Sequence, residues 1–468
     1  MASVWQRFTL SDLPDPVWLQ TSHLYGLIGS LQLWRRGSWL MPWADTIGLL
    51  LLSLVFGLAP FVSNALIGLL LVACAGFWLI ITLSDGEAGN LTRKPIHLLV
   101  LLYWGIATLA TALSPVRKAA LVGWGKLTLY LLLFALMAQI LRSARLRSWL
   151  IGLYLHIALI VSAYGIRQWF DQVEPLATWN DPSLPAANVT RVYSYLGNPN
   201  LLGGYLLPAI AFSLAALLTW RRWGPKALAL TMLIVNCYCL RYTDSRGAWI
   251  GFVILIFVFL VLLWLSQLNH LPPFWQTWAL PIGLGALVVL LALAIVAIEP
   301  IRNRVFSIFF GRGDSSSNYR LNVWSAVIEM IKKRPILGIG PGNTAFNQIY
   351  PLFQRPRYSA LSAYSILLEV SVETGFIGLS CFLWFLTVTF NQGVKHLGEL
   401  QTRANPQGFW LIGAMAAMAG MLGHGLVDTV WYRPEISMLW WLSVAVIASY
   451  GPFNSPSSVS EKSAKGAE

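Results

Sequence analysis

Apolar stretches long enough to cross a lipid bilayer recur from one end of the chain to the other, and no other feature limits the fold so strongly. A helix needs about 20 residues to span the hydrocarbon core, where backbone polar groups must pair with one another. The twelve stretches lie at residues 45–62, 64–83, 96–113, 119–141, 148–170, 202–220, 225–241, 247–266, 278–298, 366–391, 408–430 and 434–451. Because only Ser63 separates the first two, we predict an all-α polytopic transmembrane helix bundle with ten to twelve spans.

The composition excludes a large soluble protein. Of the 468 residues only 11% are charged and 57% are hydrophobic, whereas soluble domains are about 25% charged. The net charge of +13 is dispersed over short loops, which favours membrane orientation over binding to nucleic acid. No metal-binding or disulfide spacing and no phosphate-binding motif occurs, so we expect no metal, no cofactor and four buried thiols. The cysteines are Cys74, Cys237, Cys239 and Cys381.

The distribution of Lys and Arg predicts the orientation of the chain. With a cytoplasmic N-terminus, fifteen basic residues fall in cytoplasmic segments and five in the opposite short loops. Short cytoplasmic loops carry such an excess, whereas long loops are translocated largely regardless of their charge. We therefore predict a multi-pass protein of the inner (plasma) membrane with both termini in the cytoplasm. Two longer segments, 171–201 and 299–365, then face outward.

A reporter enzyme that is active only outside the cytoplasm tests this orientation. Fused after Asp314, it should be active, and fused after Glu468 it should be silent. Reporter activity in whole cells is the measurement. The opposite result at Asp314 would overturn the predicted orientation.

The chain divides into three parts on these grounds. Residues 1–44 form a cytoplasmic or interfacial tail, residues 45–451 the membrane domain, and residues 452–468 a Ser-, Lys- and Glu-rich tail expected to be disordered. Within the membrane domain, 299–365 is the one larger outward-facing loop domain, and it is long enough for structure of its own.

This outer loop contains two patterns. The first is one apolar helix face, which is expected to lie on the membrane surface or to form a lid over an outward cavity. Its residues are Trp324, Val327, Ile328 and Ile331. The second is the glycine-rich segment Gly338–Gly342. Since Pro341 removes a backbone donor and no Gly-Lys-Ser/Thr follows, we interpret it as a tight turn rather than a phosphate-binding loop.

Ionisable residues inside spans are candidate functional residues, because lipid disfavours them. Lys126 either extends its long stem to an interface or lines a cavity. His156 is expected to be a packing residue. Arg246 begins a span, and it is either an interfacial anchor beside Trp249 or a cation that binds an anionic substrate.

Two pairs of residues lie one helical turn apart. Glu369 and Glu373 share a helix face, where they could serve acid–base chemistry, bind a cation, or pair with an arginine such as Arg320. His424 and Asp428 also share a face, where the carboxylate could accept the imidazole N–H. They form either a structural polar pair or part of a site. Small residues on the same helix predict close packing against its neighbours. These are Ala416, Ala419, Gly420 and Gly423.

Five motifs in this order resemble the O-antigen ligase and polymerase superfamily over residues 195–435. They are Asn198-Pro199-Asn200-Leu201-Leu202-Gly203, Ser245-Arg246-Gly247-Ala248, Arg320 with Trp324, Pro335-Ile336-Leu337-Gly338-Ile339-Gly340, and Leu368-Glu369 through Glu373-Thr374-Gly375. Over its whole length the chain is similar to the cyanobacterial IctB-type family within that superfamily, which is associated with inorganic-carbon (bicarbonate) transport.

For a ligase, the resemblance implies an outward cavity that binds an undecaprenyl-diphosphate-linked glycan. Arg246 and Arg320 would match arginines that hold the diphosphate, and the histidine that activates the acceptor hydroxyl would fall at Tyr364. A phenol with a pKa of about 10 is a poor base at neutral pH. This departure favours a function other than enzymatic transfer.

The sequence therefore leaves functions of different classes open. The first is bicarbonate accumulation, as a transporter or an accessory protein, with Arg246, Arg320, His424 and Asp428 around a cationic outward cavity. No inverted repeat or pair of broken helices supports a transporter. The alternative is glycosyl transfer from a lipid-linked glycan, and a third possibility is an assembly partner of other membrane subunits. The expected partners are membrane lipid and either a small anion or a lipid-linked glycan.

Overall fold

The structure is a computed structural model that describes residues 2–10, 30–84, 95–173, 190–268, 271–297, 302, 315–356, 358–402, 405–428 and 430–450. Regular secondary structure within these ranges is helical throughout. Eleven helices are long and apolar enough to cross a membrane, and one shorter apolar helix follows them. The predicted all-α bundle of ten to twelve spans is confirmed. The predicted disorder of 452–468 concerns residues outside the described ranges, as do 299–301 and 303–314 of the outer loop.

The spanning helices follow the predicted order. They are α5 (Ala44–Leu58), α6 (Asn64–Ser84), α7 (Pro95–Ala112), α8 (Arg117–Ile140), α9 (Ala144–Phe170), α10 (Pro199–Thr219), α11 (Trp223–Thr243), α12 (Arg246–Gln267), α13 (Pro273–Ala297), α17 (Ile366–Gln401), α18 (Gly408–Gly425) and the shorter α19 (Pro434–Ser449). Shorter elements are α1 (Ala2–Phe8), α4 (Gln32–Gly37), α15 (Ser315–Lys333) and α16 (Asn343–Ile349).

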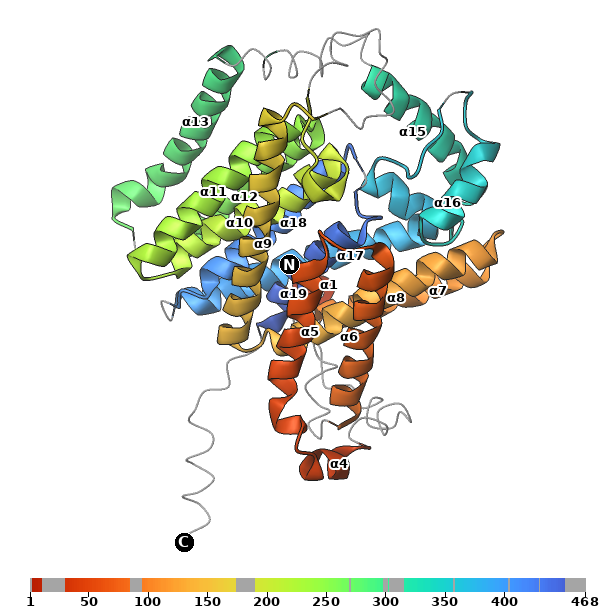
Figure 1. The fold of residues 1–468 in the computed structure, drawn as a ribbon, viewed down its shortest axis with the longest axis horizontal. Coiled ribbons are helices and arrows are strands. Elements are labelled where there is room, and N and C mark those ends of the chain that lie inside the picture. Colours follow the sequence, from red (N-terminus) through yellow and green to blue (C-terminus); the bar gives the residue numbers. More distant parts are fainter. Residues whose placement is uncertain are drawn as a thin grey trace.

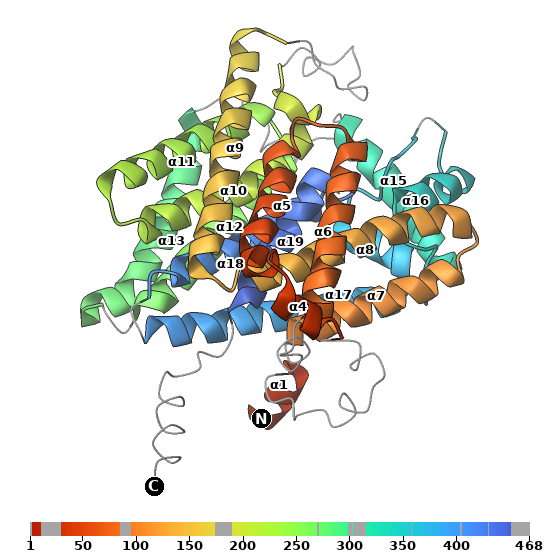
Figure 2. The same cartoon turned by 60° about the horizontal axis from the view of Figure 1, so that its bottom comes forward.

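Helices α10 and α18 form the centre of the bundle, with 83% and 89% of their spanning windows buried. In contrast, α13 stands at the margin beside α12, and none of its described residues is buried (Figures 1 and 2). Small residues bring α18 against α12, as predicted. A Cβ atom on Gly251 would lie 2.5 Å from the carbonyl oxygen of Gly420, so the two backbones touch there.

The loops gather at two opposite ends of the bundle, in agreement with the predicted alternation of spans. At one end the Arg147 guanidinium binds Gln407 and Ser449. At the other end Arg334 donates to the carbonyl of Leu113. Helices α12 and α15 both pack against α17, and α8, which carries Lys126, packs against α16 at this second end. Which side of the membrane it faces stays a prediction.

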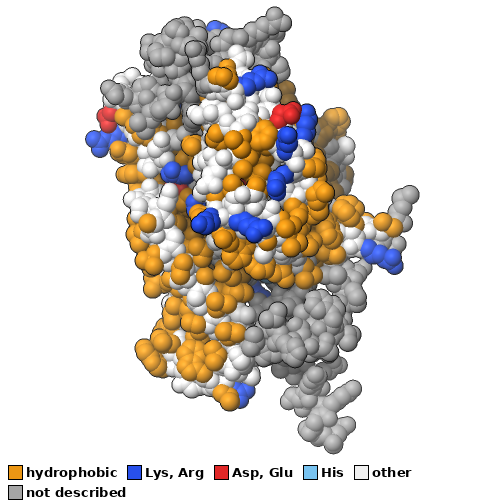
Figure 3. Space-filling view, turned by 90° about the vertical axis from the view of Figure 1, so that its right-hand side faces the viewer, with side chains coloured by type: hydrophobic (Ala, Val, Ile, Leu, Met, Phe, Trp, Pro, Cys, Tyr) orange, Lys and Arg blue, Asp and Glu red, His pale blue; other side chains and the backbone are white. Residues whose placement is uncertain are grey.

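Helices α15 and α16 form a layer over this end of the bundle (Figure 1). Val327 and Ile331 of α15 are buried in a small apolar core with Phe346 and Val372, and Ile328 is exposed. The predicted apolar face of α15 therefore packs mainly on the protein rather than on the membrane surface, because α16 and α17 cover it. Figure 3 looks onto this side, where Lys and Arg side chains stand among apolar ones.

The segment Gly338–Gly342 fits into an interruption of α17. At Gly375 the backbone of α17 leaves the helical conformation, with φ of 68° and ψ of −172°. The N–H groups of Ile339 and Gly340 bind the carbonyls of Val372 and Glu373, both at 2.9 Å. All three glycines of the segment have positive φ, which explains why this turn requires glycine. Its backbone amides donate to the carbonyl groups of α17 that the interruption leaves without helical partners. The segment is therefore a tight turn that packs against α17, as we interpreted it from the sequence.

Candidate functional site

A buried polar network joins α10, α15 and the segment after α18. Asn200 donates to an Asp428 carboxylate oxygen at 2.6 Å, and Arg320 lies 3.5 Å from the same oxygen. The side-chain oxygen Oδ1 of Asn200 accepts from Arg191 at 3.0 Å. Only 5% of the Asp428 side chain and 20% of the Arg320 side chain are exposed. The network therefore presents a fixed arginine whose charge is partly balanced by one carboxylate.

Local sequence positions these groups. The Asn198 side chain accepts from the N–H of Asn200 at 2.8 Å and caps α10, while Pro199 takes the first helical position. This cap places Asn200 in the first turn, facing Asp428. Arg246 begins α12 in the same way, after the N-cap Ser245, whose hydroxyl accepts from Ala248 N–H at 3.4 Å. Arg246 is half-buried at the end of the bundle that carries the network.

His424 and Asp428 do not form the expected pair. The Asp428 carboxylate binds Asn200 and Arg320, and neither ring nitrogen of His424 has a hydrogen-bond partner among the described residues. The imidazole is fully buried between α10 and α12, because a Cβ atom on Gly247 would lie 2.6 Å from its Cδ2 atom.

Tyr364 lies beside the network, in the segment before α17. Its carbonyl oxygen accepts from Trp324 Nε1 at 3.3 Å, and its ring is 6.2 Å from the ring of Tyr319. Burial raises the pKa of Tyr364 above its ordinary value, and the nearby Tyr319 and Asp428 raise the pKa further. At neutral pH Tyr364 is therefore deprotonated even less often than a free tyrosine, so less of it is available as a general base.

Glu369 and Glu373 share one face of α17, as their spacing predicted. Glu369 accepts from the N–H of Ala363, and Glu373 accepts from the N–H of Gly342, both at 2.6 Å. Charged acceptors make short and strong hydrogen bonds of this kind, which fix one oxygen of each carboxylate. Arg320, which the sequence offered as a partner for this pair, is instead bound to Asp428.

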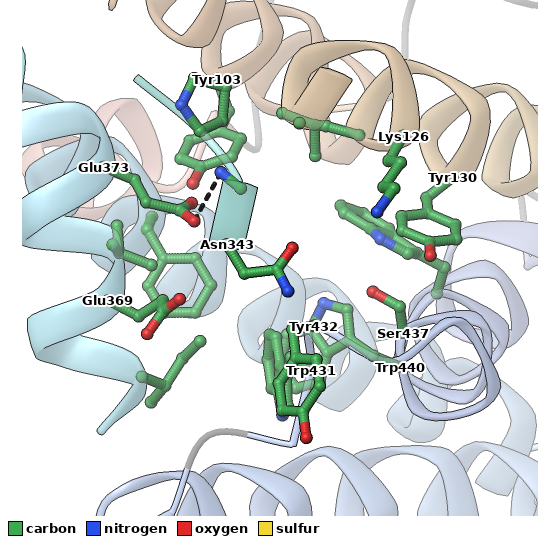
Figure 4. A pocket seen from close by; sticks show the side chains of 18 of the residues that line it. Tyr103, Lys126, Tyr130, Asn343, Glu369, Glu373, Trp431, Tyr432, Ser437 and Trp440 are labelled. Carbon is green, nitrogen blue, oxygen red and sulfur yellow. Dashed lines mark hydrogen bonds between the residues drawn. The ribbon is translucent and has the colours of Figure 1, made fainter. Parts of the chain in front are cut away.

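The two glutamates line a cavity between α7, α8, α17 and α19 (Figure 4). It encloses about 1050 Å³ of space free of atoms, including open solvent at its mouth. Lys126 of α8 lies on the wall opposite the glutamates, and Asn343 stands between the walls. Of the two interpretations of Lys126, the structure supports the cavity-lining one. The exposed His156 is not among the lining residues, and its Nδ1 lies 2.7 Å from the Gly152 carbonyl.

The sequence missed several residues of this cavity. Asn343 follows the glycine-rich segment, and Trp431, Tyr432 and Ser437 belong to the segment after α18 and the start of α19. Lys126 was the one available signal, because a cation in the middle of a span needs a polar environment. The residues that face Lys126 across the cavity belong to helices far apart in the sequence. No local pattern indicates that such residues come together.

The cavity and the polar network share a wall. Ala363 binds Glu369, and the next residue, Tyr364, is close enough to Asp428 for its pKa to respond. Tyr432 lines the cavity as well. Burial raises the pKa of Tyr432, Arg433 opposes the rise, and the carboxylates of Asp428 and Glu369 add to it. Tyr432 therefore forms the shared wall, close to the carboxylates of both sites.

Comparison with known proteins agrees with part of the resemblance. A family model described as O-antigen ligase matches residues 227–383, from α11 into α17. No curated protein matches the chain. The matched region contains Arg246, Arg320, Tyr364, Glu369 and Glu373. The chain is thus a multi-pass all-α membrane protein whose similarity to O-antigen ligases supports membership of their superfamily.

Proposed function

We propose that the protein is a glycosyl transferase that uses an undecaprenyl-diphosphate-linked glycan as its donor. The observation that carries the proposal is the position of Arg320. It lies in the region similar to O-antigen ligases, and Asp428 holds its guanidinium at the end of the bundle where Arg246 also begins α12. Guanidinium groups bind phosphate oxygens with two parallel hydrogen bonds, which suits a diphosphate.

In this scheme the arginines bind the diphosphate and stabilise the charge that it gains as the glycosidic bond breaks. The acceptor hydroxyl must lose its proton as its oxygen attacks the anomeric carbon. Tyr364 cannot accept that proton, because its raised pKa keeps the phenol protonated at neutral pH. Glu369 and Glu373, on the other side of the shared wall, are the carboxylates available for general-base catalysis. The inner membrane, with this end of the bundle facing outward, is the location that fits such a donor.

The proposal is tested with the purified chain in liposomes that contain undecaprenyl-diphosphate-linked glycan and an acceptor glycolipid. The wild type should transfer glycan, Arg246→Gln should lose transfer while still inserting, and Arg246→Lys should regain only part of it, because an ammonium cannot bind two oxygens bidentately. Arg117→Gln, which changes an exposed arginine on α8, is the matched control. Equal transfer by all four proteins would leave Arg246 as an interfacial anchor.

Replacing Tyr364 with phenylalanine is expected to change transfer only mildly. The substitution removes a hydroxyl that contributes one neutral hydrogen bond, worth about 0.5–1.5 kcal/mol, or about two- to twelvefold in rate. A general base contributes about 10²–10⁴-fold. The initial rate of transfer in the same liposomes is the measurement. A loss of a hundredfold or more at normal protein level would identify Tyr364 as the base after all.

Bicarbonate accumulation is the second candidate, and the interruption of α17 at Gly375 favours it. Secondary transporters place ion and substrate sites at interrupted helices, and here the cation Lys126 lines the cavity beside the interruption. Uptake of labelled bicarbonate, measured in liposomes that contain the chain but neither glycan nor acceptor, distinguishes the two functions. Uptake of labelled bicarbonate without glycan transfer would replace the transferase proposal with this one.

A further inference from the structure

Charges of opposite sign face each other across the cavity beneath the polar network. Glu369 and Glu373 stand on the α17 wall and Lys126 on the α8 wall (Figure 4). None of the ion pairs between described residues joins Lys126 to either carboxylate. Lys126 is exposed, whereas Glu369 is only 6% exposed. The empty cavity thus separates a buried acidic wall from an accessible basic one.

Hydrogen bonds hold the two carboxylates of the acidic wall in place. The carboxylates can therefore bind a ligand in the cavity instead of moving toward Lys126. Backbone N–H groups of Ala363 and Gly342 each fix one carboxylate oxygen. These amides belong to the segment before α17 and to the glycine-rich segment, which both pack on the bundle. Asn343, next to Gly342, projects its amide between the walls, where it can both donate and accept (Figure 4).

Aromatic rings form most of the rest of the lining. Trp431 and Trp440 lie with their ring centroids 4.1 Å apart, and Phe382 and Trp441 also line the space. On the basic side the hydroxyl groups of Tyr130 and Ser437 add further donors and acceptors. The cavity therefore combines flat apolar surfaces with polar groups at both ends.

This combination selects one class of ligand. A hydrocarbon chain would leave the second oxygen of each buried carboxyl group and the Asn343 amide without partners, which is costly in a membrane protein. A small anion would meet two carboxylates, and a cation would meet Lys126. A sugar ring avoids both conflicts, because its hydroxyls donate to carboxylates and accept from an ammonium, while its C–H face packs on an aromatic ring.

We propose that this cavity binds an uncharged sugar unit between Glu369 and Glu373 on one side and Lys126 on the other. Its description as the acceptor sugar rests on the proposed function, since the shared wall at Tyr432 would place the bound hydroxyls next to the diphosphate held by Arg320. Sugar binding itself does not rest on that function.

Photolabelling with two probes tests the proposal. The full chain in nanodiscs is exposed to a diazirine-bearing octyl glucoside, and separately to the same chain and diazirine attached to a tetraethylene glycol head. Peptides that carry label are mapped by mass spectrometry. The glucoside should label the segment that contains Trp431 and Trp440 saturably, and unlabelled octyl glucoside should compete. The tetraethylene glycol probe should not label this segment saturably.

Variants then assign the binding to the facing charges. Lys126→Met and the double variant Glu369→Gln/Glu373→Gln should each raise the half-saturating glucoside concentration about tenfold or more, because hydrogen bonds to charged groups are the strong ones. The matched controls change a second lysine of α8 and an exposed glutamate of α15. These are Lys118→Met and Glu329→Gln, and both should label like the wild type.

Three outcomes would overturn the proposal: no saturable glucoside labelling, equal labelling by the two head groups, or the same half-saturation in all variants. Should the double carboxylate variant fail to fold, Lys126→Met decides alone, since its side chain is exposed. Saturable sugar binding without any glycan transfer would refute the proposed function and keep the sugar site. Transfer without saturable binding would refute only the sugar site.

Discussion

Replacing Arg320 with glutamine is expected to lower glycan transfer by about 100- to 1,000-fold, the usual effect of removing one donor that stabilises developing charge. The guanidinium is the group that Asp428 orients, and glutamine cannot balance the charge of a leaving diphosphate. Arg320→Lys should regain only part of the rate, since an ammonium lacks the planar fork. The initial rate of transfer in liposomes is the measurement.

A structural role for Arg320 would produce a similar loss, so a second variant is needed. Arg320→Gln leaves the Asp428 carboxylate, which is 5% exposed, with Asn200 as its remaining donor among the side chains that the structure describes. Removing one partner of a buried ion pair can cost about 3–5 kcal/mol of stability. In Arg320→Gln/Asp428→Asn the stranded charge is gone, so the melting temperature should return toward that of the wild type. Transfer should stay low. Recovery of both in the double variant would show that Arg320 serves stability alone.

The sequence predicted the parts of the fold that depend on local composition. Each span was visible as an apolar stretch, because lipid requires a continuous apolar helix. The close contact of α12 and α18 was visible in the small residues Gly420 and Gly423. The glycine-rich segment was correctly interpreted as a turn, since Pro341 and the positive φ values of its glycines suit no helix.

The contacts of the candidate sites were not predictable in this way. The sequence paired Asp428 with His424 because they lie one turn apart, yet Asp428 binds Asn200 and Arg320 from distant segments. A spacing of four residues shows which side chains share a helix face, but it does not show which groups face them. The apolar face of α15 was expected on the membrane surface or in a lid over an outward cavity, because α16 and α17, which cover it, are visible only in the folded chain.

The interruption of α17 at Gly375 was also not predicted from the sequence. Because the interruption requires glycine, replacing Gly375 is expected to have the second large effect. Gly375 has φ of 68° and ψ of −172°, a conformation that is open essentially to glycine alone. A Cβ atom there would also collide with the carbonyl oxygen of Ile336. Gly375→Ala should therefore cost about 1–3 kcal/mol in backbone strain and about 1–3 kcal/mol in overpacking. Together these are a large part of the 5–15 kcal/mol that is typical of a folded protein.

The effect of Gly375→Ala should also reach the cavity. The Pro335 carbonyl accepts from Phe376, and the amide of Gly340 binds the carbonyl of Glu373, so a shift of this segment moves the acidic wall. We expect a lower melting temperature in detergent and weaker glucoside labelling at permissive temperature. Gly398→Ala, in the same helix, is the matched control, since no atom lies within 4 Å of its Cβ position. Equal melting temperatures for Gly375→Ala and Gly398→Ala would contradict this prediction. They would show that α17 can continue as a regular helix through residue 375 and does not depend on the interruption.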